Sequence, residues 1–565
     1  MKHKKYLAGV AAAGVLGAVA IWLTGPSPSP PKDTIIASPR RTAQASVLRG
    51  GTLKIATDRT IHSWDPATAS DPFMDNVRRL YLRTLMAHPQ GRNVEGHGLV
   101  PDLASAPPAV SPDATAYTFT LREGVKFEDG TPVTAADVKH GIERSLSQGV
   151  PSGLVELLDP NGTLAQARED GKTATLPSIE VPGPDTIIFR LAGPSAEFSQ
   201  LLAAPATAPV PRGKSESGYG SRPVATGPYR FAEEASGRRL ALVRNPHWNP
   251  GTDPARRALP DGVELTLGVS PGRFQELLDR DQGQDIVLIT DPAQAGTLRG
   301  AAPLGSVSDL YDRTTTYVAL TGSAPFDDLD CRRAVLLAAA DPALRAAVQA
   351  ATGGSTAPNL LPPGVEGADP SWDPYGLAGE GGKTADATAH LANCADGKGF
   401  STSLAVRGDR PADLTTAEAL KAALGRVGIT VQIVPLADDA AWQAATGTAG
   451  DLRRNGYGLV MGRTHPDGSF ARAILRPLVE DRALDERPDT QVGKTLDLAR
   501  RQSSRVAGAD LYKQVNQHLM LRARHLPLAF GRGALYVSPR VGNAFPHLAF
   551  GMPDLQGLGL SGRGD

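Results

Sequence analysis

The stretch that decides the fold is Tyr117–Leu146, YTFTLREGVKFEDGTPVTAADVKHGIERSL. Its first five residues alternate between apolar and polar side chains, which is the period of a half-buried strand. The Asp129-Gly130 dipeptide predicts a turn after that strand. Thr134, with Asp137 three residues on, predicts a helix N-terminus of the capping-box type, and apolar residues then recur every four positions. We therefore expect a strand, a turn and a capped amphipathic helix.

The same stretch resembles the signature of the family 5 extracellular solute-binding proteins, the peptide- and nickel-binding components of ABC importers. That signature contains tyrosine-x-phenylalanine-x-leucine-arginine, glycine-valine-lysine-phenylalanine, aspartate-glycine and threonine-alanine-x-aspartate-valine. The matching residues are Tyr117, Phe119, Leu121, Arg122, Gly124, Val125, Lys126, Phe127, Asp129, Gly130, Thr134, Ala135, Asp137 and Val138. Thr226-Gly227-Pro228-Tyr229 resembles a second element of the family.

The resemblance implies an α/β protein with the two-lobe, type II periplasmic-binding-protein fold and an extra subdomain in the first lobe. Residues 1–50 are then an N-terminal signal or anchor segment and a proline-rich linker. We expect residues 51–313 to form the first lobe, with the subdomain inserted at about 90–220. The second lobe is expected at 314–524, and residues 525–565 are expected to return to the first lobe.

One part of the α/β prediction needs no resemblance. Residues 400–407 and 429–434 read as strands, and a helix is expected between them from Thr415. Thr415 and Glu418 have the spacing of a capping box, and Gly428 is expected to close the helix. Two strands joined by one such helix are normally parallel, so this segment indicates an α/β layer.

The N-terminus predicts export. Lys2, Lys4 and Lys5 precede an uncharged, mostly apolar run over 6–23, and a proline-rich stretch follows it. This is the pattern of an export signal. The run approaches the ~20 residues that span a bilayer, so we expect an uncleaved anchor at about 6–24 that holds the rest at the outer face of the cytoplasmic membrane. Cleavage after Ala20, which would release the protein, is the alternative.

Composition excludes several classes of protein. Lys+Arg and Asp+Glu both number 59, and a chain without net charge lacks the basic character expected of a nucleic-acid-binding protein. The two cysteines, Cys331 and Cys394, are too few for a structural zinc site. In an exported protein they are expected to pair as a disulfide.

The sequence offers no catalytic, metal-binding or cofactor-binding motif. It contains no HExxH and no glycine-x-serine-x-glycine, and its one GxGxxG, at Gly557–Gly562, has no helix after it to receive a phosphate. No nucleophile, base and orienting group can be assigned together. We expect no enzyme activity, no bound metal and no cofactor.

The candidate ligand contacts lie around Tyr457–Phe470, where a strand ends in a polar loop. Ligands of open α/β sheets bind at such strand ends. By resemblance, Asp467 is expected to neutralise the α-ammonium of a peptide, although an Asp-Gly turn is the alternative. Arg463 stands where the family usually has tryptophan; it is expected to pair a carboxylate or phosphate, or to lie on the rim. Trp64 is expected to offer an apolar platform at the cleft entrance, with packing of its loop as the alternative.

The resemblance implies the function of an extracytoplasmic substrate-binding protein of an ABC transporter. Such a protein captures a small solute between its lobes and delivers it to permease subunits in the membrane; we expect an oligopeptide and a monomeric protein. Three alternatives remain open at this point: a non-peptide solute such as a sugar or a metal chelate, a ligand-sensing receptor not coupled to transport, and an enzyme of unfamiliar type.

Overall fold

The structure is a computed structural model. It describes residues 49–68, 71–90, 99–172, 174–195, 197–213, 218–279, 283–303, 306–394, 399–464, 471–480, 490–502, 505–547 and 550–561. The chain separates into two compact units, Met1–Ala37 and Ser38–Asp565, and every described residue belongs to the second unit. The predicted anchor segment at 6–24 lies outside the described residues.

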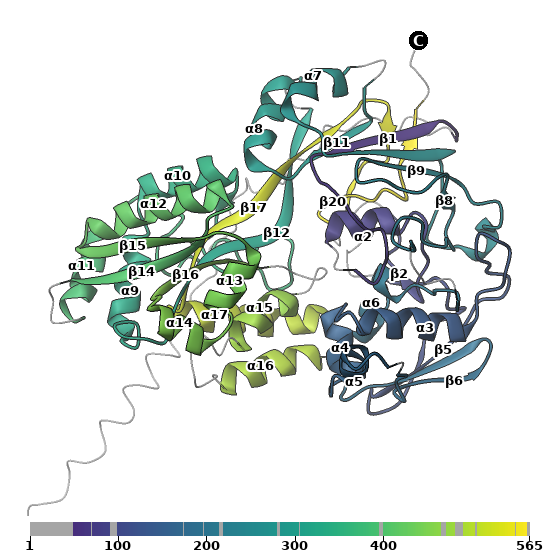
Figure 1. Ribbon diagram of the computed structural model, residues 1–565, viewed down its shortest axis with the longest axis horizontal. Helices are drawn as coiled ribbons and strands as arrows, with labels where there is room; N and C mark the ends of the chain where they lie inside the picture. The colour runs from purple at the N-terminus through teal and green to yellow at the C-terminus, as the bar shows by residue number, and fades with distance from the viewer. Residues whose placement is uncertain are drawn as a thin grey trace, which may run out of the picture. The chain divides into compact units, whose positions relative to one another are not determined.

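The main sheet has eleven strands in the order β15-β14-β16-β12-β17-β11-β1-β10-β9-β8, with β13 paired to β17 (Figure 1). In chain order these strands are β1 (Thr52–Thr57), β8 (Tyr229–Phe231), β9 (Arg239–Arg244), β10 (Gly262–Leu267), β11 (Ile286–Ile289), β12 (Val307–Leu320), β13 (Ser355–Thr356), β14 (Phe400–Arg407), β15 (Ile429–Leu436), β16 (Leu459–Arg463) and β17 (His525–Val537).

Two long strands, β12 and β17, run through the middle of this sheet (Figure 1). Near Val307 they pair beside β11, and near Ala319 they pair beside β16. Their antiparallel register shifts between Tyr311 and Thr315. We call the part on the β11 side the first lobe and the part on the β16 side the second lobe. The predicted α/β architecture of two lobes joined by crossing strands is thereby confirmed.

The first lobe is built around parallel pairs. β1 lies between β10 and β11 and is parallel to both, and its Leu53 and Ile55 are fully buried. Strands covered on both faces are expected to be apolar throughout, as β11, Ile286–Ile289, is. The lobe also contains β2 (Met86–Ala87), β3 (Val100–Pro101), β18 (Val541–Gly542), β19 (Pro546–His547), β20 (Met552–Pro553), β21 (Gly559–Leu560), α2 (Pro72–Arg78), α7 (Phe274–Leu277) and α8 (Pro292–Ala301).

A four-stranded sheet and four helices form a separate core, which we call the subdomain. Its elements are β4 (Ala109–Val110), β5 (Ala116–Thr120), β6 (Ile179–Gly183), β7 (Thr186–Arg190), α3 (Ala135–Leu146), α4 (Ser152–Leu158), α5 (Thr163–Glu169) and α6 (Phe198–Leu201). The strand, turn and helix predicted from the opening stretch are confirmed here. Thr134 Oγ1 accepts from the Asp137 N–H at 3.4 Å, and Asp137 Oδ2 accepts from the Thr134 N–H at 2.9 Å, so the capping box is reciprocal.

The second lobe packs helices around β14, β15 and β16. These helices are α9 (Leu329–Ala338), α10 (Pro342–Thr352), α11 (Thr384–Ala392), α12 (Pro411–Gly425), α13 (Asp439–Thr446), α14 (Ala449–Asn455), α15 (Ala471–Glu480), α16 (Thr490–Arg500) and α17 (Arg505–Leu521). Cys331 on α9 and Cys394, just after α11, form a disulfide inside the buried core of the lobe.

The strand-helix-strand unit is present, but its helix begins earlier than predicted. β14 and β15 are parallel, with Phe400 opposite Ile429, and α12 joins them. The helix starts at Pro411, so the capping box assigned to Thr415 is wrong. Proline is favoured in the first turn because its missing N–H would be unpaired there anyway. Thr415 lies inside the helix, and its hydroxyl donates to the Pro411 carbonyl at 3.0 Å.

Candidate functional site

The strand ends of the second lobe gather arginines at one edge of the sheet. β14 is parallel to β16, so Arg407 and Arg463 end neighbouring strands at the same edge. Gly462, next to Arg463, allows β16 to pack closely against Tyr317 of the neighbouring strand β12, because a Cβ at Gly462 would lie 2.9 Å from Tyr317 Cζ. The edge is the place where open α/β sheets bind ligands.

Arg463 is held by the first turn of α12. Its Nη2 donates to Asp413 Oδ1 at 2.9 Å, and the Asp413 side chain is almost completely buried. Arg463 Nε is buried without a hydrogen-bond partner among the described residues. Roughly a third of the side chain stays exposed, so the guanidinium is partly fixed and partly open to a ligand.

Two more arginines raise the positive charge of this edge. Arg407 donates to both carboxylate oxygens of Asp409, at 2.9 and 2.7 Å. Burial lowers the pKa of Arg410, and Arg463 lowers it further. We call Arg407, Asp409, Arg410, Asp413 and Arg463 the strand-end cluster. Its three guanidiniums outnumber its two carboxylates, which favours an anionic group of a ligand.

β16 ends in this cluster at Arg463, and Thr464 follows it. Thr464 is fixed to β12, because its Oγ1 accepts from the Thr315 N–H at 2.8 Å and its N–H donates to the Thr315 carbonyl at 3.0 Å. Asp467 itself lies outside the described residues. Its pairing with a ligand ammonium remains a prediction.

Trp64 lies in the core of the first lobe. Its side chain is 1% exposed and belongs to the same buried cluster as Phe73 and Tyr81. The Trp64 carbonyl accepts from Tyr81 Oη at 2.8 Å, and the Trp64 N–H donates to the Gly220 carbonyl at 2.7 Å. The structure thus assigns the indole a packing role in its loop, and its contact with a ligand remains a prediction.

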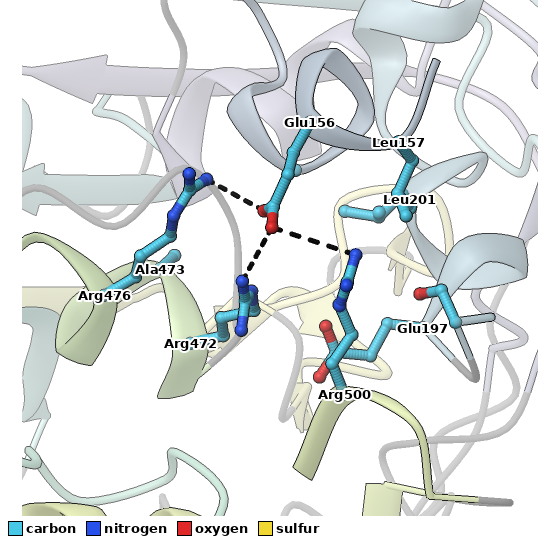
Figure 2. Close-up of a pocket in the computed structure, with 10 residues that line it drawn as sticks. Glu156, Leu157, Glu197, Leu201, Arg472, Ala473, Arg476 and Arg500 are labelled. Carbon is cyan, nitrogen blue, oxygen red and sulfur yellow. Dashed lines mark hydrogen bonds and ion pairs between the residues drawn. The ribbon is translucent and has the colours of Figure 1, made fainter. Parts of the chain in front are cut away.

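The two lobes meet through charged side chains at a small cavity (Figure 2). Glu156 projects from α4 of the subdomain toward arginines of the second lobe. Its carboxylate lies 2.8 Å from Arg472 Nη2 and 2.8 Å from Arg476 Nη1, both on α15. Arg500, the last residue of α16, is 3.8 Å away. We call these four residues the interlobe cluster.

A second contact crosses the same boundary. Tyr512 Oη on α17 donates to Oε1 of Glu197, a residue that precedes α6 of the subdomain.

The interlobe cluster surrounds the cavity with charge. Burial lowers the pKa of Arg500, while Glu156 raises it and Arg472 lowers it further. The cavity has a volume of about 40 Å³. At ~10–15 Å³ for each water this space suits a few water molecules and not a peptide, so we assign it to lobe contact and not to solute binding.

No sequence motif points to the interlobe cluster. Glu156 lies in an apolar helix segment without a motif, and its partners are 316 to 344 residues further along the chain. A single acidic residue on the apolar stretch Leu154–Leu158 was the one available signal, since a charge there needs a partner.

The described residues contain no group of three or more His, Cys, Asp and Glu placed to hold a metal ion.

Among the helices of the described residues, none has by itself the length and apolar composition of a membrane span. The bent pair α9 and α10 has that length and composition when the two helices are taken together. Both helices contribute to the buried core of the second lobe.

Two lobes joined by two crossing strands, with arginines at the strand ends of the second lobe, are the arrangement expected of a two-lobe solute-binding protein. Residues 98–482 match the family described as "Bacterial extracellular solute-binding proteins, family 5 Middle", and the chain belongs to that family. It is an extracytoplasmic substrate-binding protein of the kind that serves ABC importers. The family consists of binding proteins and not of enzymes.

Among solved structures, the chain is similar to clavulanic acid biosynthesis oligopeptide binding protein 2. The two are 31% identical with a TM-score of 0.79, over 91% of this chain and 96% of that chain. The unliganded open form of the periplasmic murein tripeptide binding protein MppA shares the fold, with 20% identity and a TM-score of 0.70 over 91% of this chain and 98% of that chain. Heme-binding protein A of Haemophilus influenzae is 24% identical over 80% of this chain and 83% of its own length.

Proposed function

We propose that this protein captures an oligopeptide between its lobes and delivers it to permease subunits of an ABC importer. The observation that carries the proposal is the likeness to an oligopeptide binding protein over 91% of the chain at 31% identity. The strand-end cluster adds a chemical reason, because a peptide brings a carboxylate that guanidiniums bind well.

In this proposal Arg463 pairs the peptide carboxylate and Asp467 its α-ammonium. A desolvated ammonium needs a charged acceptor, and Asp467 follows Arg463 by four residues. Trp64 is the third predicted contact. We further propose a monomer without catalytic activity, held at the membrane by residues 6–24. The division into lobes at 51–313, 314–524 and 525–565 is part of the same proposal.

Mass spectrometry of small molecules that co-purify with the full-length protein tests the ligand class. We expect peptides of two to five residues, and titration calorimetry with those peptides then gives their affinity. The peptide proposal is wrong if no peptide co-purifies and a peptide library causes no thermal shift.

Variants then test the contacts. Asp467→Asn should weaken binding of a peptide with a free N-terminus by about 2 kcal/mol and leave an N-acetylated peptide unaffected. Arg463→Gln should weaken binding of a peptide with a free C-terminus and leave binding of a C-terminally amidated peptide unaffected. Trp64→Leu is informative only where the unfolding midpoint is retained, because the indole also packs in the core.

A non-peptide solute is the second candidate. Arg463 stands where the family usually has tryptophan. In addition, one relative, which this chain matches over 83% of that relative's length, is a heme-binding protein. A planar tetrapyrrole or another anionic solute in the co-purified fraction, with no peptide beside it, would support this candidate. A lone gene without permease neighbours would support a sensing role.

A further inference from the structure

A groove of about 610 Å³ lies in the subdomain, on elements that take no part in the interlobe cluster. Five of the residues that line it are basic or imidazole side chains, namely His140, Arg144, Arg168, Lys172 and Arg212. Glu143 is the one acidic residue that lines it. The chain as a whole carries equal numbers of basic and acidic residues, so this is a local concentration of positive charge.

Helical spacing explains how the groove is built. His140 and Arg144 lie at i and i+4, so α3 presents them on one face, with Ser147 directly after the helix, while its apolar face packs in the subdomain core. Leu164, on α5, is followed by Ala167 and Arg168 on the same side. The groove is therefore lined by cationic side chains and, along α5, by the apolar side chains of Leu164 and Ala167.

Most of the remaining charges are already compensated. The Glu143 carboxylate accepts from the Leu176 N–H at 2.6 Å and lies 3.4 Å from Lys139 Nζ. Arg144 pairs with Asp65. Lys172 lies 3.1 Å from Asp170 in an exposed pair, and such pairs contribute little and exchange readily.

Arg168 and Arg212 are different. Neither side chain has a hydrogen bond or ion pair with any residue in the described part of the chain. The C-terminal ends of α3 and α5 border the groove and bring about half a negative charge each. Among the described residues, two guanidiniums therefore face about one negative charge from the helix ends. Burial raises the pKa of Glu143 and Arg212 lowers it, so Arg212 also lies within electrostatic range of that carboxyl. Burial lowers the pKa of His140, and Arg212 and Arg144 lower it further, which agrees with an excess of cations around the imidazole.

We propose that this groove binds an anion of the phosphate class that carries a small organic group. Guanidiniums bind phosphate oxygens in pairs of hydrogen bonds, and Arg168, Arg212 and Lys172 supply the donors. The volume falls within the ~300–1,000 Å³ usual for small-molecule sites and exceeds what a bare phosphate needs. Leu164 and Ala167 provide apolar surface for the organic group. The ligand is either a free phosphomonoester or the phosphate headgroup of a membrane lipid.

The test compares two double variants of the full-length protein. Arg168→Gln with Arg212→Gln removes two of the guanidiniums that line the groove. Arg238→Gln with Arg257→Gln removes two exposed arginines elsewhere and is the matched control. Calorimetry with glycerol 3-phosphate, and sedimentation with vesicles of phosphatidylglycerol or phosphatidylcholine, give the readouts.

We expect the groove variant to lose at least tenfold in affinity for glycerol 3-phosphate, for phosphatidylglycerol vesicles or for both, while the control binds as the parent protein does. Binding of glycerol 3-phosphate indicates a free phosphomonoester. Binding of phosphatidylglycerol vesicles beyond that of phosphatidylcholine, without competition by glycerol 3-phosphate, indicates a lipid headgroup. The proposal is overturned if the parent protein binds neither probe, or if both double variants bind alike.

Discussion

Two clusters of arginines and carboxylates in this molecule differ in how deeply they are buried and in how fully their polar atoms are hydrogen-bonded. In the first, Arg83 and Arg256 meet Asp102 and Asp253, and all four side chains are at most 1% exposed. In the second, the interlobe cluster, Glu156 is 22% exposed and Arg476 32%. We call the first group the buried network.

The buried network is fully hydrogen-bonded. Arg83 Nε donates to Asp102 Oδ1 at 2.7 Å, and Arg256 Nη1 donates to Asp102 Oδ2 at 2.8 Å. The outer nitrogens also reach backbone carbonyls, such as Leu82 O from Arg256 Nη2 at 3.0 Å. Burial raises the pKa of Asp253, but Arg256 and Arg83 lower it more, so the net shift is downward.

The interlobe cluster is less complete. Three guanidiniums contact the carboxylate of Glu156, although Arg472 and Arg476 also pair with Asp497 and Glu480. Arg500 Nε is buried without a hydrogen-bond partner in the described part of the chain. A contact that is partly solvated and partly unsatisfied is inexpensive to open. The same type of ion pair is thus buried and complete inside the first lobe, and partly solvated where it joins the subdomain to the second lobe. We expect the first to fix structure and the second to open at little cost.

Removing the centre of the buried network should have the largest effect. Asp102→Ala leaves two buried guanidiniums without their shared carboxylate, so we expect a loss of about 3–5 kcal/mol in the free energy of unfolding. Urea denaturation measures it. Asp170→Ala, which breaks the exposed pair with Lys172, is the control and should cost less than about 1 kcal/mol. An equal small cost for both variants would remove the distinction between the two groups.

Acid should weaken the first lobe next to the buried network. His547 is 5% exposed, and burial, together with Arg79, lowers the pKa of its imidazole from 6.5 to about 4. The unfolded chain then binds the proton more readily than the folded chain, so the stabilisation is complete above pH 6.5 and is lost as the pH falls toward 4. The expected loss from this residue is about 3 kcal/mol at pH 4.

The measurement is the free energy of unfolding at several pH values between 7 and 4. His547→Gln cannot titrate, so its curve should fall less steeply than that of the parent protein. His62→Gln changes an exposed imidazole and serves as the control, with a curve parallel to the parent's. Parallel curves for all three proteins would exclude His547 as the source of the acid sensitivity.

Breaking the interlobe cluster should change lobe contact more than stability. Glu156→Gln keeps the size of the side chain and removes the charge that Arg472 and Arg476 share. We expect the equilibrium between closed and open lobes to shift about fivefold to tenfold toward open, which corresponds to about 1–1.4 kcal/mol. Fluorescence energy transfer between labels at residues 169 and 421 measures that equilibrium.

Glu480→Gln is the matched control for this experiment. Glu480 also pairs with Arg476, at 2.9 Å, but both residues lie on α15, so the pair does not cross between lobes. The control should leave the energy transfer unchanged. If both variants open the protein equally, the charge of Arg476 matters and the contact with Glu156 does not.

The sequence predicted the parts of the molecule in which the information is local. The strand, turn and capped helix of Tyr117–Leu146 follow from neighbours three or four residues apart, and the parallel pair of β14 and β15 follows from one helix between two strands. The start of α12 was missed because two signals competed. Pro411 fits a first turn as well as Thr415 fits a cap, and no local rule ranks them.

The candidate site was predictable only as far as its position on a strand end. Arg463 was expected where a strand ends, and it is the last residue of β16, but its partner Asp413 lies 50 residues earlier on another element. For Trp64 the sequence left a ligand platform and packing of its loop open, and tertiary contacts in the cluster with Phe73 and Tyr81 bury it. Such pairings depend on how distant segments pack, which neither periodicity nor a motif contains.

Ionic strength should affect the interlobe cluster and not the buried network, and this is the smallest of the expected effects. Raising the ionic strength from 0.1 to 1 M shortens the screening length from ~10 to ~3 Å, which weakens solvated ion pairs and leaves buried ones nearly unchanged. The closed population of the parent protein should therefore fall about twofold, and the Glu156→Gln variant should respond less because its charge is already absent. The destabilisation caused by Asp102→Ala should be the same at both salt concentrations. The opposite result would be that high salt removes the destabilisation caused by Asp102→Ala and leaves the open–closed equilibrium unchanged. That result would mean that the buried network, and not the interlobe cluster, is exposed to solvent ions.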